Sequence, residues 1–259
     1  MDEGEGDMTT TFAVLGQFGD AIQFIFEGET TREGTEVGGS QFLELTWEHV
    51  KLSVVAMAIA CAVSVPLGLW LGHHRRGQFL AISFSNIGRA VPSLALIAFF
   101  VAYLGVGFTN LTLALVLLAI PPILTNAYVG VTQVNPDTVD AARGIGMTEG
   151  EIVRKVELPL ALPLIFGGIR TSAVNVIATA TIAPLAGVNT LGDPIINASG
   201  YGDTGRLAAA IVVAALAVFT ELLLGTAQRA VTPEGIKLDS DQASRRGRIQ
   251  IPIRRHAST

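Results

Sequence analysis

The most constraining feature of this sequence is a long stretch without any charged side chain. Between Ala90 and Pro136 there is no Asp, Glu, Lys or Arg. A helix crosses the hydrocarbon core of a bilayer with about 20 residues, so this stretch is long enough to cross it twice. Charged residues make up only 15% of the 259 residues, against about 25% in a typical soluble domain. The sequence therefore predicts an all-α polytopic membrane protein.

Five transmembrane helices are predicted from the apolar runs. Proline and glycine inside these runs do not argue against them, because membrane helices tolerate both where neighbouring groups satisfy the freed backbone. The predicted spans cover residues 50–72, 79–104, 110–132, 163–187 and 207–228.

The spans define a predicted transmembrane domain, residues 41–236, with an addition at each end. Residues 1–40 are predicted to be an extension that is partly disordered or interfacial, because Phe18, Ile22 and Ile25 have the spacing of a short amphipathic helix. Its acidic start, MDEGEGD, is not that of a signal peptide, which begins with basic residues. Residues 237–259 form a basic tail.

Basic residues in the short loops predict the orientation. The first span is followed by HHRRGQ, residues 73–78, and short loops rich in Lys and Arg stay in the cytoplasm. An odd number of spans then places the N-terminus outside and the basic tail inside a plasma membrane. His73 and His74 are expected to be solvated in this loop. The net charge of −5 gives no indication of nucleic-acid binding.

A polar segment, residues 136–159, interrupts the apolar runs. Asn135 is placed to cap a helix that has Pro136 at its first position. The helix is expected to end near Gly144 or Gly146. Thr148 and Glu151 then form a capping-box pattern, and a second helix is expected to end at Leu158, because a residue before proline disfavours helical geometry.

This polar segment is longer than a simple connection between spans requires, and long ordered loops tend to be functional. Its small residues would let another backbone or side chain come close. The residues alone leave two interpretations open. The segment is either a docking element for a soluble partner or a connector packed on the protein's own surface.

The segment DAARGIGMTEGEIVRKVELPLALP resembles the EAA loop of permeases from ATP-binding-cassette (ABC) importers. The family pattern is Glu-Ala-Ala, three residues, Gly, nine residues, Ile, one residue, Leu-Pro. Here Asp replaces Glu and Val replaces Ile, and both changes keep charge or shape. The predicted ATPase-coupling residues are these positions plus Gly144 from the same small-residue run: Asp140, Ala141, Ala142, Gly144, Gly146, Val156, Leu158 and Pro159.

The resemblance covers about residues 42–236. The stretches RAVPSLALIAFF and GIRTSAVNVIATATIAPLAG are similar to the osmoprotectant branch, whose members carry glycine betaine, choline, carnitine and related quaternary ammonium solutes. Where that branch usually has Gly-Gly-Leu-Gly-Asp, this chain has Asn-Thr-Leu-Gly-Asp at residues 189–193.

The resemblance implies a type I importer permease with a cytoplasmic helix-turn-helix coupling loop. Its implied partners are a second permease subunit, identical or related, two ATP-binding subunits that each receive an EAA loop, and an external solute-binding protein. The chain itself is expected to be a transport subunit and not an enzyme, with ATP bound on the partner. Its sequence contains no glycine-rich phosphate loop, and it has no cluster of metal ligands.

Three ionisable residues fall inside the predicted spans, where each costs about 2.5–3.5 kcal/mol at a helix centre. Arg170 and Glu221 have similar predicted depths, so they are candidates for an intramembrane ion pair, or else they extend to the interface. Arg89 lies deeper. It is a candidate for the solute pathway together with Pro92 and Ser93, with helix packing as the alternative role.

Two other functions remain as alternatives. Permeases of D-methionine-type amino-acid importers also have five spans and a similar loop. A secondary transporter would need no ATPase, but the long polar segment and the lack of repeats or of buried acids suited to ion coupling argue against it.

Overall fold

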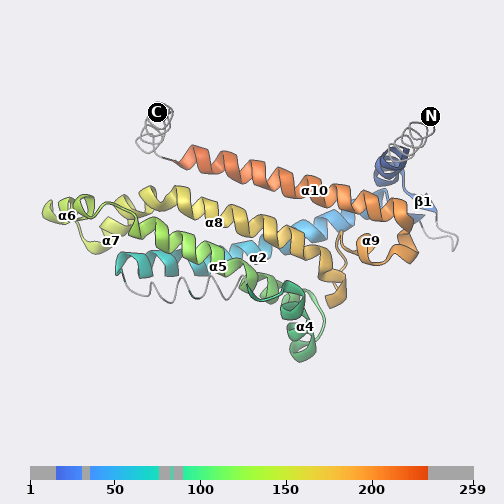
Figure 1. Cartoon of the computed structure of the whole chain (residues 1–259), viewed down its shortest axis with the longest axis horizontal. Coiled ribbons are helices and arrows are strands. Elements are labelled where there is room, and N and C mark those ends of the chain that lie inside the picture. The colour runs from blue at the N-terminus through green and yellow to red at the C-terminus, as the bar shows by residue number, and fades with distance from the viewer. Residues whose placement is uncertain (1–15, 31–35, 76–82, 84–89, 233–259) are drawn as a thin grey trace, which may run out of the picture.

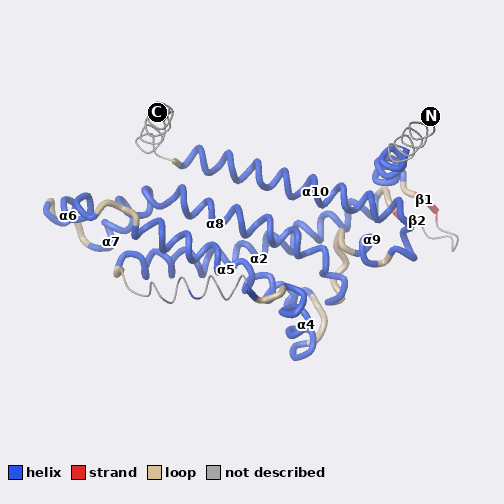
Figure 2. Tube along the Cα trace, in the orientation of Figure 1, coloured by secondary structure: helices blue, strands red, loops and turns tan. Residues whose placement is uncertain are grey.

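The computed structural model describes residues 16–30, 36–75, 83 and 90–232, and nearly all of them are helical (Figure 2). The longer helices are α2 (Ser40–His73), α4 (Ser93–Leu104), α5 (Phe108–Thr132), α8 (Leu158–Thr179) and α10 (Ala198–Val231). The shorter elements are α6 (Pro136–Gly144), α7 (Glu149–Ile152), the π-helical turn η1 (Val153–Glu157), the 3₁₀ helix η2 (Ala180–Ala186) and α9 (Asp193–Ile196). Residues 16–27 are also helical, and β1 (Glu29–Thr30) pairs with β2 (Glu36–Val37) in antiparallel fashion.

Four helical stretches among the described residues are long and apolar enough to cross a membrane. They contain α2, α5, α8 and α10 and correspond to the first, third, fourth and fifth predicted spans. The second predicted span is represented by the shorter apolar helix α4, and residues 79–82 and 84–89 lie outside the described residues. The multi-pass all-α fold is therefore confirmed, while four full-length spans, not five, lie within the part of the chain described here.

Helix α5 forms the centre of the bundle. It packs against α2 on one side and α8 on the other, and α10 lies against the outer side of α8 (Figure 1). In its most apolar stretch, 56% of α5 is buried, against 17% for α10. A helix as apolar as α10 that buries so little of itself within the chain is suited to contact lipid or another membrane subunit.

Small residues explain why α2 and α5 lie so close together. Gly68 and Gly72 are one turn apart on α2 and face Ala127 and Val131 of α5. A Cβ atom added at Gly72 would lie 2.7 Å from the Cβ atom of Val131, which is too near for two carbon atoms. Pairs of small residues at this spacing are a common device of membrane helix packing.

The end of the bundle that carries α9 also carries the N-terminal helix. Phe24 packs edge-on against Phe42 of α2, with ring centroids 5.7 Å apart. Both rings join a buried cluster with Leu191 and with Ala208 of α10. The opposite side of the N-terminal helix exposes Ile22. The side of residues 16–27 that packs on the protein carries Ala21 and Phe24, whereas Phe18, like Ile22, is exposed.

Candidate functional site

The polar segment (residues 136–159) lies at the opposite end of the bundle from α9 (Figure 1). The Asn135 side chain accepts a hydrogen bond from the backbone N–H of Asp137 at 2.9 Å and caps α6, which has Pro136 as its first residue. Helix α6 ends at Gly144, and Gly146 has a φ of 88°. Both the predicted cap and the predicted glycine turn are confirmed.

The second helix begins with the predicted capping box. The Thr148 hydroxyl accepts a hydrogen bond from the backbone N–H of Glu151 at 3.4 Å, and the Glu151 carboxylate accepts one from the backbone N–H of Thr148 at 3.1 Å. These reciprocal bonds satisfy donors that a helix start would otherwise leave free.

The prediction that this helix ends at Leu158 was wrong. The chain remains helical from α7 through η1 into α8 and passes Pro159 without a break, so α8 begins at Leu158 and not near Pro163. The π-helical turn η1 ends at Glu157, just before Leu158, and Pro159, which has no backbone N–H, falls in the first turn of α8. The polar segment is therefore rigidly continuous with α8.

An apolar underside holds the polar segment together. Val139 and Ala142 of α6 pack on Ile152 of α7 and on Val134, and all four side chains are buried. Val156 packs partly buried against this cluster. Ala142, one of the predicted coupling residues, therefore faces this cluster within the chain and not a partner.

The other side of the polar segment is exposed and shaped by small residues. Asp140, Ala141, Gly144 and Gly146 are exposed, and a Cβ atom added at either glycine would find no other atom within 4 Å. Ile145 stands between these glycines with 81% of its surface exposed. Sequence reasoning missed Ile145, although a large apolar residue between two glycines in a polar run is a usable signal for a contact surface.

The last two predicted coupling residues belong to the junction with α8. Leu158 packs against the buried cluster of Ala127 and Val131 from α5 and Ala161 from α8. Pro159 follows it in the first turn of α8. Of the eight predicted coupling residues, four thus form the exposed tip, while Ala142, Val156, Leu158 and Pro159 connect that tip to the bundle.

Charged side chains link the polar segment to the end of α2. His73 Nδ1 lies 2.8 Å from Glu157 Oε2, and His73 Nε2 lies 3.1 Å from Glu149 Oε2. Glu149 also accepts hydrogen bonds from the guanidinium of Arg143, which reaches Asp140 at 3.0 Å. The expectation that His73 is solvated was wrong, because only 9% of its side chain is exposed, whereas its neighbour His74 is exposed.

Arg143 and Glu149 stabilise each other's charged forms, and the pKa of Glu149 is lowered mainly by its hydrogen bond from Arg143. The hydrogen bond from Arg143 to Glu149 is the main cause that raises the pKa of Arg143, and Asp140 adds to it. A cleft of about 280 Å³ lies between the end of α2 and α6, with His73, Asp140, Arg143 and Glu157 among its lining residues. The electrostatic links therefore join four elements, α2, α6, α7 and η1, around this cleft.

Two charged residues inside the spans also meet. Arg170 Nε of α8 lies 3.1 Å from Glu221 Oε1 of α10, and the two side chains are 38% and 44% exposed. Gln228 of α10 extends the contact, because its side-chain amide donates a hydrogen bond to the Pro163 carbonyl at 2.7 Å. These polar contacts hold α10 against α8.

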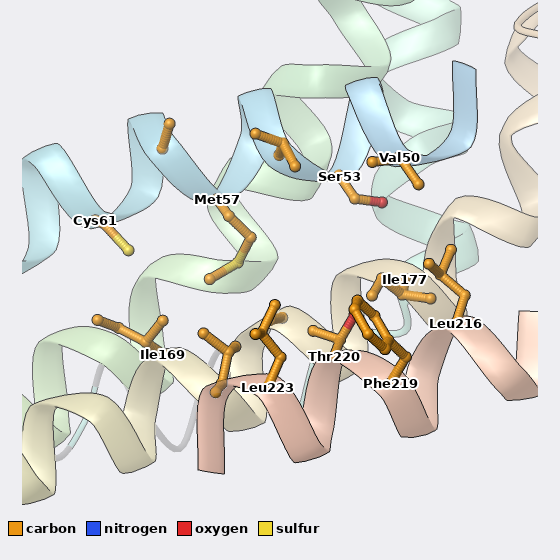
Figure 3. Close-up of a pocket in the computed structure, with 14 residues that line it drawn as sticks. Val50, Ser53, Met57, Cys61, Ile169, Ile177, Leu216, Phe219, Thr220 and Leu223 are labelled. Carbon is orange, nitrogen blue, oxygen red and sulfur yellow. The ribbon is translucent and has the colours of Figure 1, made fainter. Parts of the chain in front are cut away.

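Two of the three predicted pathway residues, Pro92 and Ser93, fall in the described part of the chain. Arg89 lies outside the described residues. Pro92 precedes α4 and Ser93 is its first residue. An apolar cavity of about 440 Å³ instead lies between α2, α8 and α10 (Figure 3), with Met57, Ile169 and Phe219 among the residues around it.

The Asn-Thr-Leu-Gly-Asp sequence forms the turn before α9. The Thr190 hydroxyl donates a hydrogen bond to the Ala180 carbonyl at 2.9 Å and accepts one from the backbone N–H of Gly192. Asp193 accepts a hydrogen bond from the Tyr201 hydroxyl at 2.8 Å. The turn is thereby fixed to η2 and α10 at the end of the bundle opposite the polar segment.

Potential metal ligands do not cluster in the described part of the chain, where no three His, Cys, Asp or Glu side chains are grouped to hold an ion. The arrangement offers an exposed, rigidly supported tip at one end, apolar spans between, and a fixed turn at the other end.

Comparison with known proteins gives consistent matches. Residues 64–233 match the family described as binding-protein-dependent transport system inner membrane component. A glycine betaine/carnitine/choline transport system permease protein of Bacillus subtilis is 39% identical over 78% of this chain and 94% of its own length. The carnitine transport permease protein OpuCB of Listeria monocytogenes is 38% identical over 77% and 92%.

Solved structures share the fold at lower identity. A chain of the inward-facing MetNI methionine ABC transporter aligns with a TM-score of 0.65 and 23% identity, over 74% of this chain and 96% of that one. A chain of an amino acid ABC transporter with histidines gives a TM-score of 0.57 and 21% identity, over 73% and 93%.

Proposed function

Because this chain belongs to the family of binding-protein-dependent transport system inner membrane components, we propose that it is the permease subunit of an ATP-driven importer for quaternary ammonium osmoprotectants. Glycine betaine, choline and carnitine are the candidate solutes. The strongest support is the identity of 38–39% to osmoprotectant and carnitine permeases over nearly their whole length.

The proposed partners are those that the family implies, and the geometry of the polar segment supports one of them. Its exposed tip of small residues and Ile145 is suited to enter a groove of a separate ATP-binding subunit, which would bind and hydrolyse ATP, so this chain would need no cofactor of its own. The lightly buried α10 is suited to contact lipid or a second permease subunit. An extracytoplasmic solute-binding protein would deliver the solute at the α9 end.

This arrangement requires a defined orientation in the plasma membrane. The polar segment and the basic tail would lie in the cytoplasm, with the N-terminus and the turn between α4 and α5 outside. In a Cys61→Ala background, a cysteine at Thr109 should react with an impermeant thiol reagent in intact cells. A cysteine at Thr138 in α6 should react only after the membrane is opened. The reverse pattern would contradict the assignment of the coupling segment.

Uptake by the complete complex tests the substrate. The permease, its ATP-binding subunit and its binding protein are reconstituted in liposomes, and radiolabelled glycine betaine, choline, carnitine and methionine are compared with and without ATP. We expect ATP-dependent uptake of at least one quaternary ammonium solute and none of methionine.

Two other results would each select another function. ATP-dependent uptake of methionine alone would favour the amino-acid importer. The fold shared with MetNI is compatible with that function, but a shared fold does not by itself imply a shared substrate. Uptake that persists without ATP would favour a secondary transporter.

A further inference from the structure

His73 is the last residue of α2, and it contacts two glutamates of the polar segment at once. One ring nitrogen pairs with Glu157 of η1 and the other with Glu149 of α7, at 2.8 Å and 3.1 Å. A neutral imidazole has a single N–H, so only the doubly protonated ring can donate to both carboxylates. The geometry therefore places both ring nitrogens within hydrogen-bonding distance of a carboxylate.

Burial makes the contact between His73 and Glu157 energetically costly to break. The side chains of His73 and Glu157 are only 9% and 6% exposed. A buried carboxylate that loses its partner remains uncompensated, which is strongly unfavourable. Glu157 is therefore expected to hold the end of α2 in place whenever it is charged.

The contacts continue from His73 to the exposed tip. Glu149 accepts hydrogen bonds from Arg143 at 2.8 Å and 3.1 Å, and Arg143 bonds to Asp140 at 3.0 Å. Three successive contacts, Asp140 to Arg143, Arg143 to Glu149 and Glu149 to His73, thus connect the predicted coupling residue Asp140 to the end of α2. A fourth contact, from His73 to Glu157, joins that end to η1.

The polar segment has three connections to the bundle. Two are covalent, since residues 133–135 join it to the end of α5 and η1 continues into α8. The third is electrostatic, through His73 into α2, which packs tightly on α5 at Gly72 and Val131. A displacement of the tip would reach α5 and α8 along the chain, but it would reach α2 only through side-chain contacts such as those of His73.

We infer that His73 is a positioning residue for transport coupling. It ties α2 to the polar segment, so that a movement imposed there by the ATP-binding subunit shifts α2 together with α5 and α8. This inference rests on the proposed function, because it assumes that an ATP-binding subunit acts on the tip. A pair of exposed charges would not suffice for this role, whereas the pair of His73 with Glu157 is buried.

The number of solute molecules transported per ATP hydrolysed in proteoliposomes tests this inference. His73→Ala should still bind the ATP-binding subunit through the exposed tip but lower this ratio by roughly fivefold or more, within the usual range of coupling between sites. Glu157→Gln should lower it similarly, and the double variant should be no worse than either single one, because both remove the same contact. His73→Lys, which retains a cation, should recover part of the ratio.

His74→Ala is the matched control. His74 is adjacent and exposed. Its ring hydrogen-bonds to the Trp70 carbonyl and contacts the His73 ring edge-on, but it pairs with neither Glu149 nor Glu157, so this variant should transport normally. If His73→Ala keeps the wild-type ratio, the inference is wrong. Should His73→Ala not accumulate, Glu157→Gln removes the charge of the same buried contact while keeping the shape of the side chain, and a normal ratio there would overturn the inference equally.

The same experiment separates this inference from the proposed function. If the wild-type complex shows no ATP-dependent uptake of any solute tested, the proposed function fails whatever His73 does. If the wild type is coupled and the His73 variants do not differ from it, only the role of His73 fails.

Discussion

Gly146→Val is expected to reach the membrane at near-normal levels and to lose ATP-driven transport. Gly146 has a φ of 88°, and a β-branched residue there costs on the order of 1–3 kcal/mol of backbone strain. The position is open within this chain, because an added Cβ atom would meet nothing within 4 Å, so the added bulk would collide with a docked partner and not with the protein's own core. The measurements are co-purification of the ATP-binding subunit and ATP hydrolysis stimulated by loaded binding protein.

The matched control is Gly150→Ala, which also has open space around its Cβ position but lies within α7 with ordinary helical geometry. It should bind the ATP-binding subunit and transport normally. Asp140→Ala should be milder than Gly146→Val, because it removes an exposed charge without adding bulk. Normal binding and transport by Gly146→Val would mean that the tip is not where the ATP-binding subunit docks.

Gly192→Ala is expected to destabilise the fold at the opposite end of the bundle. A Cβ atom at this position would overlap the backbone carbonyl of Thr181 in η2. The overlap can be relieved only if the turn before α9 moves away from η2. Overpacking of this kind typically costs about 1–3 kcal/mol. The variant should show a lower thermal unfolding midpoint in detergent and a lower yield in the membrane.

Gly200→Ala provides the comparison, since an added Cβ atom there meets nothing within 4 Å and alanine favours a helix more than glycine does. Its unfolding midpoint should equal or exceed that of the wild type. A Gly192→Ala variant as stable as Gly200→Ala would show that the turn around Thr190 adjusts without cost.

Local physical chemistry made several features of this protein predictable from its sequence. The uncharged run from Ala90 to Pro136 required a membrane-spanning fold, because so few charges leave no soluble alternative. The cap at Asn135, the capping box at Thr148 and the positive φ of Gly146 depend on residues only two or three positions apart. The family resemblance of residues 140–159 likewise depends on a contiguous pattern.

Other features depended on contacts between residues far apart in the chain. Pro159 was expected to end a helix, but the π-helical turn before it lets the helix continue into α8. Helix α2 begins at Ser40, ahead of the predicted span, and its first turn packs Phe42 against Phe24 of the N-terminal helix, a contact between separate helices.

The role of His73 shows most clearly what only the tertiary structure decided. In the sequence it stands in a basic loop, next to His74, and the two residues have the same local environment. In the folded chain His73 meets Glu157, 84 positions away, and is buried, while His74 bonds within its own helix. Local sequence determines which helices form and where they are capped. Which of two adjacent histidines enters an ion pair is decided by the packing of α2 against the polar segment, because burial and charge pairing act through space.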